Sequence, residues 1–539
     1  MNNVTPDTVD LLVIGGGING AGIARDAAGR GLSVVLCEQG DLAGGTSSAS
    51  SKMIHGGLRY LEHYEFRLVR EALAEREVLL DIAPHLVHPL RFVLPHDASL
   101  RPAWMIRVGL FLYDRLGGRR RLAGSHGLDL AADPAGEPLR NERRKGFVYT
   151  DCRVDDSRLV VLNALGAAEL GATILTRTRC AEARRDGGAW IVVLRDAITG
   201  RERSMRARIL VNAAGPWVNK VHDASIAAAA TLRVRLVKGS HIVVARLYDG
   251  DHAYILQNDD GRVVFALPFE ENFTLIGTTD VPYAGDPNGI RIDSDEIDYL
   301  CAAINRYFER PIGAGDVVWS YAGVRPLLDD GAGDPAAVTR DYRLEIEAPE
   351  GGAPLLSVFG GKITTYRRLA EQAMAKLAPY TPGVGGPWTA SSPLPGGDID
   401  DAARFLNQTR ARYPWLPAGL AARYVNAYGT LTAALLDGAD GLDDLGHDFG
   451  ASLFEREVAY LADTEWARSA EDILWRRSKL GLVCPKETAP ALDDWFAGVA
   501  PEQRQAQWRG DVPVAIDRRA SISTTLAIAK PKTDSNGRL

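Results

Sequence analysis

The stretch VDLLVIGGGINGAGIARDAAGRGLSVVLCEQ, residues 9–39, decides the fold. The apolar run at residues 9–14 ends at glycines, which is typical of a buried parallel strand. Residues 18–30 follow the pattern of a helix with small residues on its packing face, and residues 33–37 form a second apolar strand. This order of strand, turn, helix and strand predicts a Rossmann-like α/β domain that binds a dinucleotide.

The glycines between the first strand and the helix fit the G-x-G-x-x-G motif. Gly15 allows the tight turn, Gly17 lets a pyrophosphate approach the backbone, and Gly20 lets helix and strand pack closely. The N-terminus of the helix offers unpaired N–H groups to the same anion. We therefore assign Gly15, Gly17, Asn19 and Gly20 to the cofactor site.

An acidic residue follows the second strand at the distance expected for this motif. Glu38 can accept hydrogen bonds from both ribose hydroxyls, and it would repel a 2′-phosphate. This residue disfavours NADP, but the motif alone does not separate FAD from NAD.

The next polar stretch, GGTSSASSKMIHGGLRYLEH at residues 44–63, favours FAD. An NAD-binding fold would continue here with a helix pattern. Instead, Thr46, Ser47, Ser50 and Ser51 supply donors at the start of a helix, which suits the second phosphate and the ribityl chain of FAD. The alternative is a solvated loop with an N-cap.

The rest of the chain predicts an α/β fold in which an FAD-binding, two-dinucleotide Rossmann-like domain is joined to an antiparallel β-sheet substrate domain and a helical C-terminal domain. A hairpin turns at residues 198–200, and a buried strand at 209–213 leads to Ala214 and Gly215. The predicted divisions are an FAD-binding domain (8–90, 150–225 and 350–380), a substrate domain (91–149 and 226–349), a linker (381–398), a helical C-terminal domain (399–520) and a disordered tail (521–539).

Composition excludes several classes of protein. The chain has 539 residues, too many for one hydrophobic core, and its net charge of −7 disfavours a nucleic-acid binder. Its five cysteines form no CxxC pair, so no metal site, cluster or redox dithiol is expected, and a reducing compartment fits best. No signal peptide and no apolar run of about 20 residues is found, so we expect no membrane span.

The segment 101–121 is unusual, because nearly continuous apolar residues are flanked by arginines. It includes Trp104, Phe111 and Tyr113. A core helix is the simpler interpretation, and an amphipathic helix lying on a membrane surface is the alternative.

Several further segments belong together: VIGGGINGAGIARDAAGRGLSV, TSSASSKMIHGGLRYLEHYEFRLV, VNAAGPWV, KGSHIVV, GTTDV, GVRPL, TRDY and LLSVFGGKITTYRRLAE. Taken in this order, they resemble the aerobic, FAD-dependent glycerol-3-phosphate dehydrogenases of bacteria, and the likeness covers about residues 8–515. The resemblance implies oxidation of sn-glycerol 3-phosphate to dihydroxyacetone phosphate, with hydride passing to N5 of FAD and electrons to ubiquinone or another quinone. It also implies a cytoplasmic homodimer bound peripherally to the inner membrane.

The resemblance also indicates the substrate site, which must hold a small dianion. The expected substrate contacts are Arg59, Tyr60, Thr278, Arg325, Arg340 and Lys362, because arginine suits bidentate phosphate binding and lysine a point charge. Arg325 and Lys362 are placed near the reacting centre, and His241 is the ordinary candidate for a base. A core histidine remains the alternative, and the identity of the base stays open. Further expected cofactor contacts are Lys52, Ala214, Gly215, Gly361 and Thr364.

The sequence contains no second nucleotide motif and no dithiol, so the reduced flavin needs an external acceptor, either a quinone or dioxygen. Two rival functions remain. One is an amine or amino-acid oxidase, which would bind a carboxylate with one arginine and a tyrosine. The other is a non-catalytic flavin-binding sensor or membrane adaptor, which would not need the cations.

Overall fold

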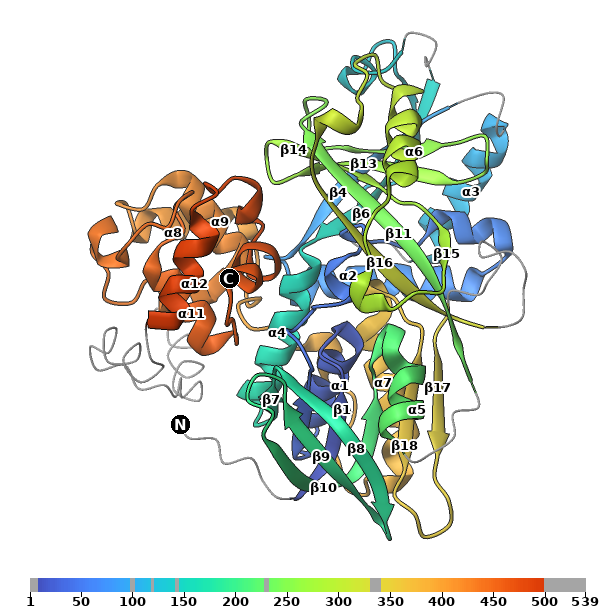
Figure 1. Ribbon diagram of the computed structural model, residues 1–539. Coiled ribbons are helices and arrows are strands. Elements are labelled where there is room, and N and C mark those ends of the chain that lie inside the picture. The colour runs from blue at the N-terminus through green and yellow to red at the C-terminus, as the bar shows by residue number, and fades with distance from the viewer. Residues whose placement is uncertain are drawn as a thin grey trace, which may run out of the picture.

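The computed structural model describes residues 8–96, 102–117, 121–140, 145–226, 232–329 and 341–498 (Figure 1). Two sheets with flanking helices lie one above the other in this view, and a helical C-terminal domain stands at their side. Of the expected site residues, Arg340 lies outside the described ranges, as do the end of the predicted C-terminal domain and the predicted tail.

The first sheet contains the nucleotide-binding unit. Strand β1 (Thr8–Ile14) is flanked by β2 (Val34–Cys37) and β10 (Glu202–Asn212), and both pairs are parallel. Its strand order is β17 (Arg343–Glu347), β18 (Leu355–Phe359), β10, β1, β2 and β7 (Thr173–Leu175), with the hairpin β8 (Thr178–Asp186) and β9 (Ala189–Asp196) attached to β10. The predicted Rossmann-like unit is confirmed, because α1 (Ile18–Gly29) connects β1 to β2 and packs against α4 (Asp156–Glu169) and α7 (Tyr366–Leu377).

The second sheet carries the predicted substrate side. Its order is β15 (Val281–Tyr283), β11 (Val234–Ala245), β14 (Phe273–Gly277), β13 (Val263–Phe269), β12 (Ala253–Gln257), β4 (Val87–Pro95), β6 (Lys145–Val154) and β3 (Met53–Ile54), with β16 (Val317–Leu328) on β11 and β5 (His126–Asp129) on β6. The pairs within this sheet are antiparallel, as predicted, except that β4 and β12 are parallel. A long connection joins these two strands, whereas a hairpin would make them antiparallel.

The polar stretch at residues 44–63 runs from one sheet to the other. It begins after β2 in the first sheet, and its residues 53–54 form β3, which pairs with β6 in the second sheet. The stretch then forms a 3₁₀ turn, Leu58–His63, before α2 (Phe66–Ile82). It is therefore positioned to contact a ligand lying between the two sheets.

The segment predicted as a core or membrane-surface helix forms α3 (Ala103–Leu116) and combines both interpretations. Ile106, Leu110 and Tyr113 face the core, while Trp104, Met105, Val108, Phe111 and Leu112 are exposed. Tyr113 corrects the expectation that it belongs to an apolar surface. Its buried hydroxyl donates to Asp151 (2.7 Å to Oδ2) and accepts from the Gly56 N–H (2.8 Å).

The remaining helices include α5 (Val218–Ser225) and α6 (Ser294–Asn305), and the C-terminal domain contains α8 (Ala402–Arg412), α9 (Ala418–Tyr428), α10 (Thr432–Leu435), α11 (Glu455–Thr464) and α12 (Thr488–Gly498). The segment 381–398, predicted as a linker, packs on α1: the Trp388 indole donates to the Asp26 carbonyl (3.1 Å). Within the described ranges, no helix has both the length and the apolar character needed to cross a bilayer.

Candidate active site

A cavity of about 510 Å³ lies where the carboxyl ends of β1, β2 and β10 meet the second sheet. This edge is where ligands bind in open α/β sheets. Sixteen of the predicted site residues line it: Gly15, Gly17, Asn19, Glu38, Thr46, Ser47, Ser50, Ser51, Tyr60, Ala214, Gly215, His241, Arg325, Gly361, Lys362 and Thr364. The cavity thus brings together residues from both predicted halves of the site.

The glycine-rich turn has the geometry that a pyrophosphate requires. Gly15 has a φ of +112°, and a Cβ at Gly20 would lie 1.9 Å from the Gly15 carbonyl oxygen. Gly20 therefore does not line the cavity but holds α1 against the turn. The Ser47 hydroxyl accepts from the Ile18 N–H (3.0 Å), so the N-terminus of α1 presents its donors beside the polar stretch.

The predicted ribose acceptor, Glu38, is half-buried and follows directly on β2. Its carboxylate accepts from the Gly16 N–H (2.7 Å) and the Gly40 N–H (2.8 Å). Burial raises the pKa of Glu38 above its usual value, and these two backbone hydrogen bonds partly oppose that shift. The residue therefore organises the glycine-rich turn and the loop after β2 around the same carboxylate.

Several buried polar atoms of cavity-lining residues lack hydrogen-bond partners within the described ranges. They include the Asn19 Oδ1 and the Trp217 Nε1. Both residues line the cavity, and a buried indole N–H usually finds a partner, so these atoms fit a polar cofactor. Trp217 was missed from the sequence, although it follows the predicted contacts Ala214 and Gly215 almost directly.

The hydroxyls of the polar stretch also tie the two sheets together. Thr46 Oγ1 donates to the Val324 carbonyl (2.6 Å), and Ser50 Oγ donates to Asp156 (2.7 Å). Lys52 departs from the expectation of a flavin contact: its buried ammonium lies 2.9 Å from Asp156 Oδ2 and does not line the cavity. Asp156 begins α4, so Lys52 anchors the stretch to that helix.

The end of the cavity predicted to bind the substrate carries two of the four expected cations, Arg325 and Lys362. Arg325, on β16, donates to Asp280 Oδ1 (2.7 Å) and to Thr278 Oγ1 (2.8 Å). Thr278 does not line the cavity itself but orients Arg325. The Lys362 ammonium lies 3.8 Å from the centre of the Tyr60 ring, which places a positive charge beside a phenol.

Arg59 is the remaining expected substrate contact that the structure describes. It follows Gly57 in the 3₁₀ turn and does not line the cavity. Its buried Nε has no hydrogen-bond partner among the residues described. The structure thus brings Arg325, Lys362 and Tyr60 to the cavity, and leaves Arg59 next to it.

His241 lines the same cavity from β11. Its Nε2 lies 2.8 Å from Ser51 Oγ, and its ring stacks on Tyr321 with 4.8 Å between centroids. Burial lowers the pKa of His241 well below its usual value, and the positive charges of Arg325 and Lys52 lower it further. The imidazole is therefore neutral at neutral pH, and it lies at the site rather than in a remote core.

Comparisons with known proteins agree with this geometry. A profile described as FAD dependent oxidoreductase matches residues 10–367, and one described as C-terminal domain of alpha-glycerophosphate oxidase matches residues 387–508. A glycerol-3-phosphate dehydrogenase of Pseudomonas aeruginosa is 57% identical over 92% of this chain and 96% of its own length. The chain belongs to the FAD-dependent glycerol-3-phosphate dehydrogenase family. A D-erythritol 1-phosphate dehydrogenase of Brucella abortus is 56% identical over 91% of this chain and 98% of its own.

A solved structure places the same fold around the cofactor of this family. The glycerol-3-phosphate dehydrogenase from Bacillus halodurans, complexed with FAD, has a TM-score of 0.72 and 29% identity, covering 93% of both chains. The cofactor of the present chain is FAD, and the protein is an oxidoreductase. The glycine turn, the polar atoms without partners and the cavity lined from both sheets fit that cofactor, as expected of a member of the glycerol-3-phosphate dehydrogenase family.

Proposed function

We propose that this protein oxidises sn-glycerol 3-phosphate to dihydroxyacetone phosphate. The observation that carries the proposal is the position of Arg325, Lys362 and Tyr60 on the cavity that begins at the nucleotide-binding turn. A pocket with two cations suits a phosphate dianion better than a single carboxylate. This argues against an amino-acid oxidase, and the same cations argue against a non-catalytic flavin sensor.

The reaction removes a hydride from carbon and a proton from oxygen. FAD supplies the hydride acceptor when it is bound. Of the chain's own residues, we assign Arg325 and Lys362 to binding the substrate and stabilising negative charge on its oxygens, because an alcohol is a poor acid. We assign neutral His241 as the proton acceptor, and Ser51, its hydrogen-bond partner, as the group that orients the ring.

Flavin reduction is expected to show no His241 titration between about pH 6 and 8. An isolated histidine has a pKa of about 6.5, but His241 is held below this, so its neutral form persists as the pH falls through that window. The rate of flavin reduction should be measured by anaerobic stopped flow across this range. A fall in the rate of flavin reduction below about pH 6.5 that is absent in His241→Gln would contradict the expectation.

The proposed function is tested by anaerobic bleaching of the bound flavin. Glycerol 3-phosphate should bleach the holoenzyme, and a short-chain quinone should restore the oxidised spectrum. D-erythritol 1-phosphate, named in the 56%-identical relative, is the second substrate to compare by kcat/KM. Bleaching by amino acids alone would favour an oxidase, and a flavin that stays oxidised with every substrate would favour a sensor.

We propose a membrane quinone as the electron acceptor, reached through the exposed side of α3. Trp104 and Phe111 on this helix are 67% and 53% exposed. Tyr64, which directly follows the turn Leu58–His63, is 80% exposed. Helix α3 packs on α2 and on the turn Leu58–His63, which carries Arg59 and Tyr60. An apolar face next to the substrate site supports docking on the bilayer in which a quinone resides.

The double variant Trp104→Ser/Phe111→Ser is expected to weaken liposome binding about tenfold or more. Each aromatic side chain contributes roughly 1.5–3 kcal/mol when it is removed from water. Cosedimentation with vesicles of mixed neutral and anionic lipids measures the loss. The control is Ile198→Ser, which removes a more exposed apolar side chain (74%) from the β9–β10 hairpin and should not alter binding. Unchanged binding of the double variant would place the membrane surface elsewhere.

The domain boundaries, the homodimer and the cytoplasmic, peripheral membrane location are also proposals. Light scattering of the purified holoenzyme measures its molar mass. Separation of cell membranes before and after a high-salt wash tests peripheral attachment.

A further inference from the structure

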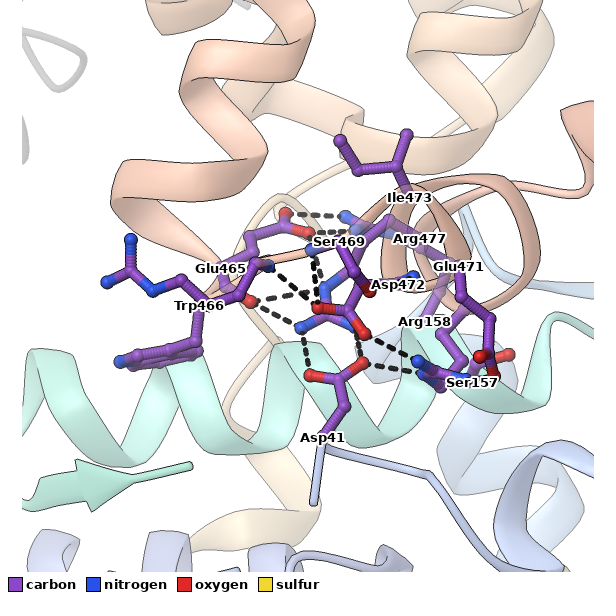
Figure 2. A network of polar contacts seen from close by, with 12 residues as sticks. Asp41, Ser157, Arg158, Glu465, Trp466, Ser469, Glu471, Asp472, Ile473 and Arg477 are labelled. Atoms are coloured by element: carbon purple, nitrogen blue, oxygen red, sulfur yellow. Dashed lines mark hydrogen bonds and ion pairs between the residues drawn. The ribbon is translucent and has the colours of Figure 1, made fainter. Parts of the chain in front are cut away.

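Residues 39–45 form a loop between the predicted ribose acceptor, Glu38, and the hydroxyls that begin at Thr46. Side chains of the C-terminal domain bind this loop. Its Asp41 is buried, and Arg477 binds it with two parallel hydrogen bonds, Nη1 to Oδ2 at 2.7 Å and Nη2 to Oδ1 at 2.8 Å (Figure 2). Arg476 adds a third contact (2.7 Å), and Arg177 a fourth (3.2 Å). Three guanidinium groups thus surround one carboxylate.

Two of these arginines come from the C-terminal domain, in a π-helical segment, Asp472–Arg477. Arg477 also donates to the Glu465 carbonyl (2.6 Å), and the Glu465 carboxylate pairs with Arg158 of α4. Figure 2 shows these groups converging above Asp41. The contact is therefore a buried network that joins the C-terminal domain to one short loop.

The charges in this network are mutually compensated. Burial alone would raise the pKa of Asp41, but the positive charge of Arg477, followed by those of Arg476 and Arg177, lowers it to about 2. The carboxylate therefore remains ionised, and a bidentate pair of this kind fixes orientation as well as distance. Changing Asp41 would deprive the buried Arg477 guanidinium of its bidentate carboxylate partner.

The loop that this network holds makes several contacts with the cofactor cradle. The Gly40 N–H donates to Glu38, the Ala43 N–H donates to the Gly16 carbonyl (3.0 Å), and a Cβ at Gly16 would meet the Leu42 side chain. Gly44 and Gly45, at the end of this loop, and Thr46, directly after it, line the cavity. A shift of Asp41 would displace the ribose acceptor and the glycine-rich turn together.

We propose that the C-terminal domain is a positioning element for FAD, acting through Arg477 and Arg476 on Asp41. Neither arginine lines the cavity, so these are positioning residues. The inference rests on FAD as the cofactor and is independent of which polyol phosphate is oxidised. Thermodynamic linkage requires the reverse effect as well: FAD should stabilise the contact between the loop and the C-terminal domain.

The test compares Arg477→Lys and Asp41→Asn with Arg423→Lys. Arg423 makes a similar bidentate pair with Glu457, but inside the C-terminal domain and away from the loop. We expect the FAD Kd of the deflavinated protein, measured by quenching of flavin fluorescence, to rise about 10–100-fold in the first two variants, as when residues that orient a ligand-binding group are changed. Arg423→Lys should leave Kd within about threefold of the starting protein.

Equal losses of affinity in all three variants would overturn the proposal, because they would reflect general destabilisation. A lowered Tm with an unchanged Kd in Arg477→Lys would also overturn it. A measurement on the unaltered protein guards against variants that fail to fold: FAD should slow hydrogen exchange in the peptide covering residues 472–477. Identical exchange with and without FAD would show that the contact is not coupled to the cofactor.

Discussion

Arg325→Ala is expected to lower the rate of flavin reduction by glycerol 3-phosphate about 10²–10³-fold while FAD stays bound. Removing one preorganised donor at a site of developing negative charge costs this much in well-studied enzymes. Arg325 is such a donor: Asp280 and Thr278 fix its guanidinium at the cavity, with contacts of 2.7 and 2.8 Å. The residues of the nucleotide-binding turn are untouched by the change, so cofactor content should persist.

Two further variants separate charge from geometry. Arg325→Lys keeps the positive charge but loses the planar guanidinium group. Its rate of flavin reduction should therefore lie between those of the unaltered protein and Arg325→Ala. Arg262→Ala is the control, because Arg262 pairs with Asp260 in the β12–β13 hairpin and does not line the cavity. Stopped-flow absorbance at the flavin band measures all the rates. A rate of reduction in Arg325→Ala equal to that of the control would remove Arg325 from the mechanism.

The nucleotide-binding part of the site could be predicted because its determinants are local. The turn, the helix and Glu38 lie within one strand–helix–strand unit, so their spacing in sequence carries their geometry. Arg325 and His241 were reached only through resemblance. Both lie on strands of the second sheet, and no local pattern distinguishes a cavity-facing residue there from a core one.

The parts that could not be predicted depend on distant partners. Lys52 was grouped with the flavin contacts because it follows a run of hydroxyls, but Asp156, 104 positions later, binds it. Asp41 lies between two predicted cofactor residues, yet its partner Arg477 is 436 positions away. A buried ion pair between remote segments leaves no periodic signal in a single sequence. Tyr113 was likewise misplaced, because the sequence pattern identifies helix α3 but not which of its faces packs against the core.

Gly20→Ala is expected to weaken FAD binding about 100-fold or more, so that the purified variant carries little flavin. The added Cβ would lie 1.9 Å from the Gly15 carbonyl oxygen, and this atom cannot give way as a flexible side chain can. Gly15 is itself fixed, because its N–H donates to the Cys37 carbonyl (2.9 Å). Helix α1 would have to move away from the turn, which withdraws its N-terminal donors from the pyrophosphate.

The control for this variant is Gly419→Ala in α9, where an added Cβ meets no atom within 4 Å. That change should leave the flavin content unaltered and stabilise the helix by up to about 1 kcal/mol, since alanine favours helix over glycine. The flavin-to-protein absorbance ratio of the purified proteins measures occupancy. If Gly20→Ala carried a full complement of FAD, the tight packing of α1 against the turn would not be what holds the cofactor. Retained folding of the variant without flavin would instead show that this backbone contact serves the cofactor more than the core.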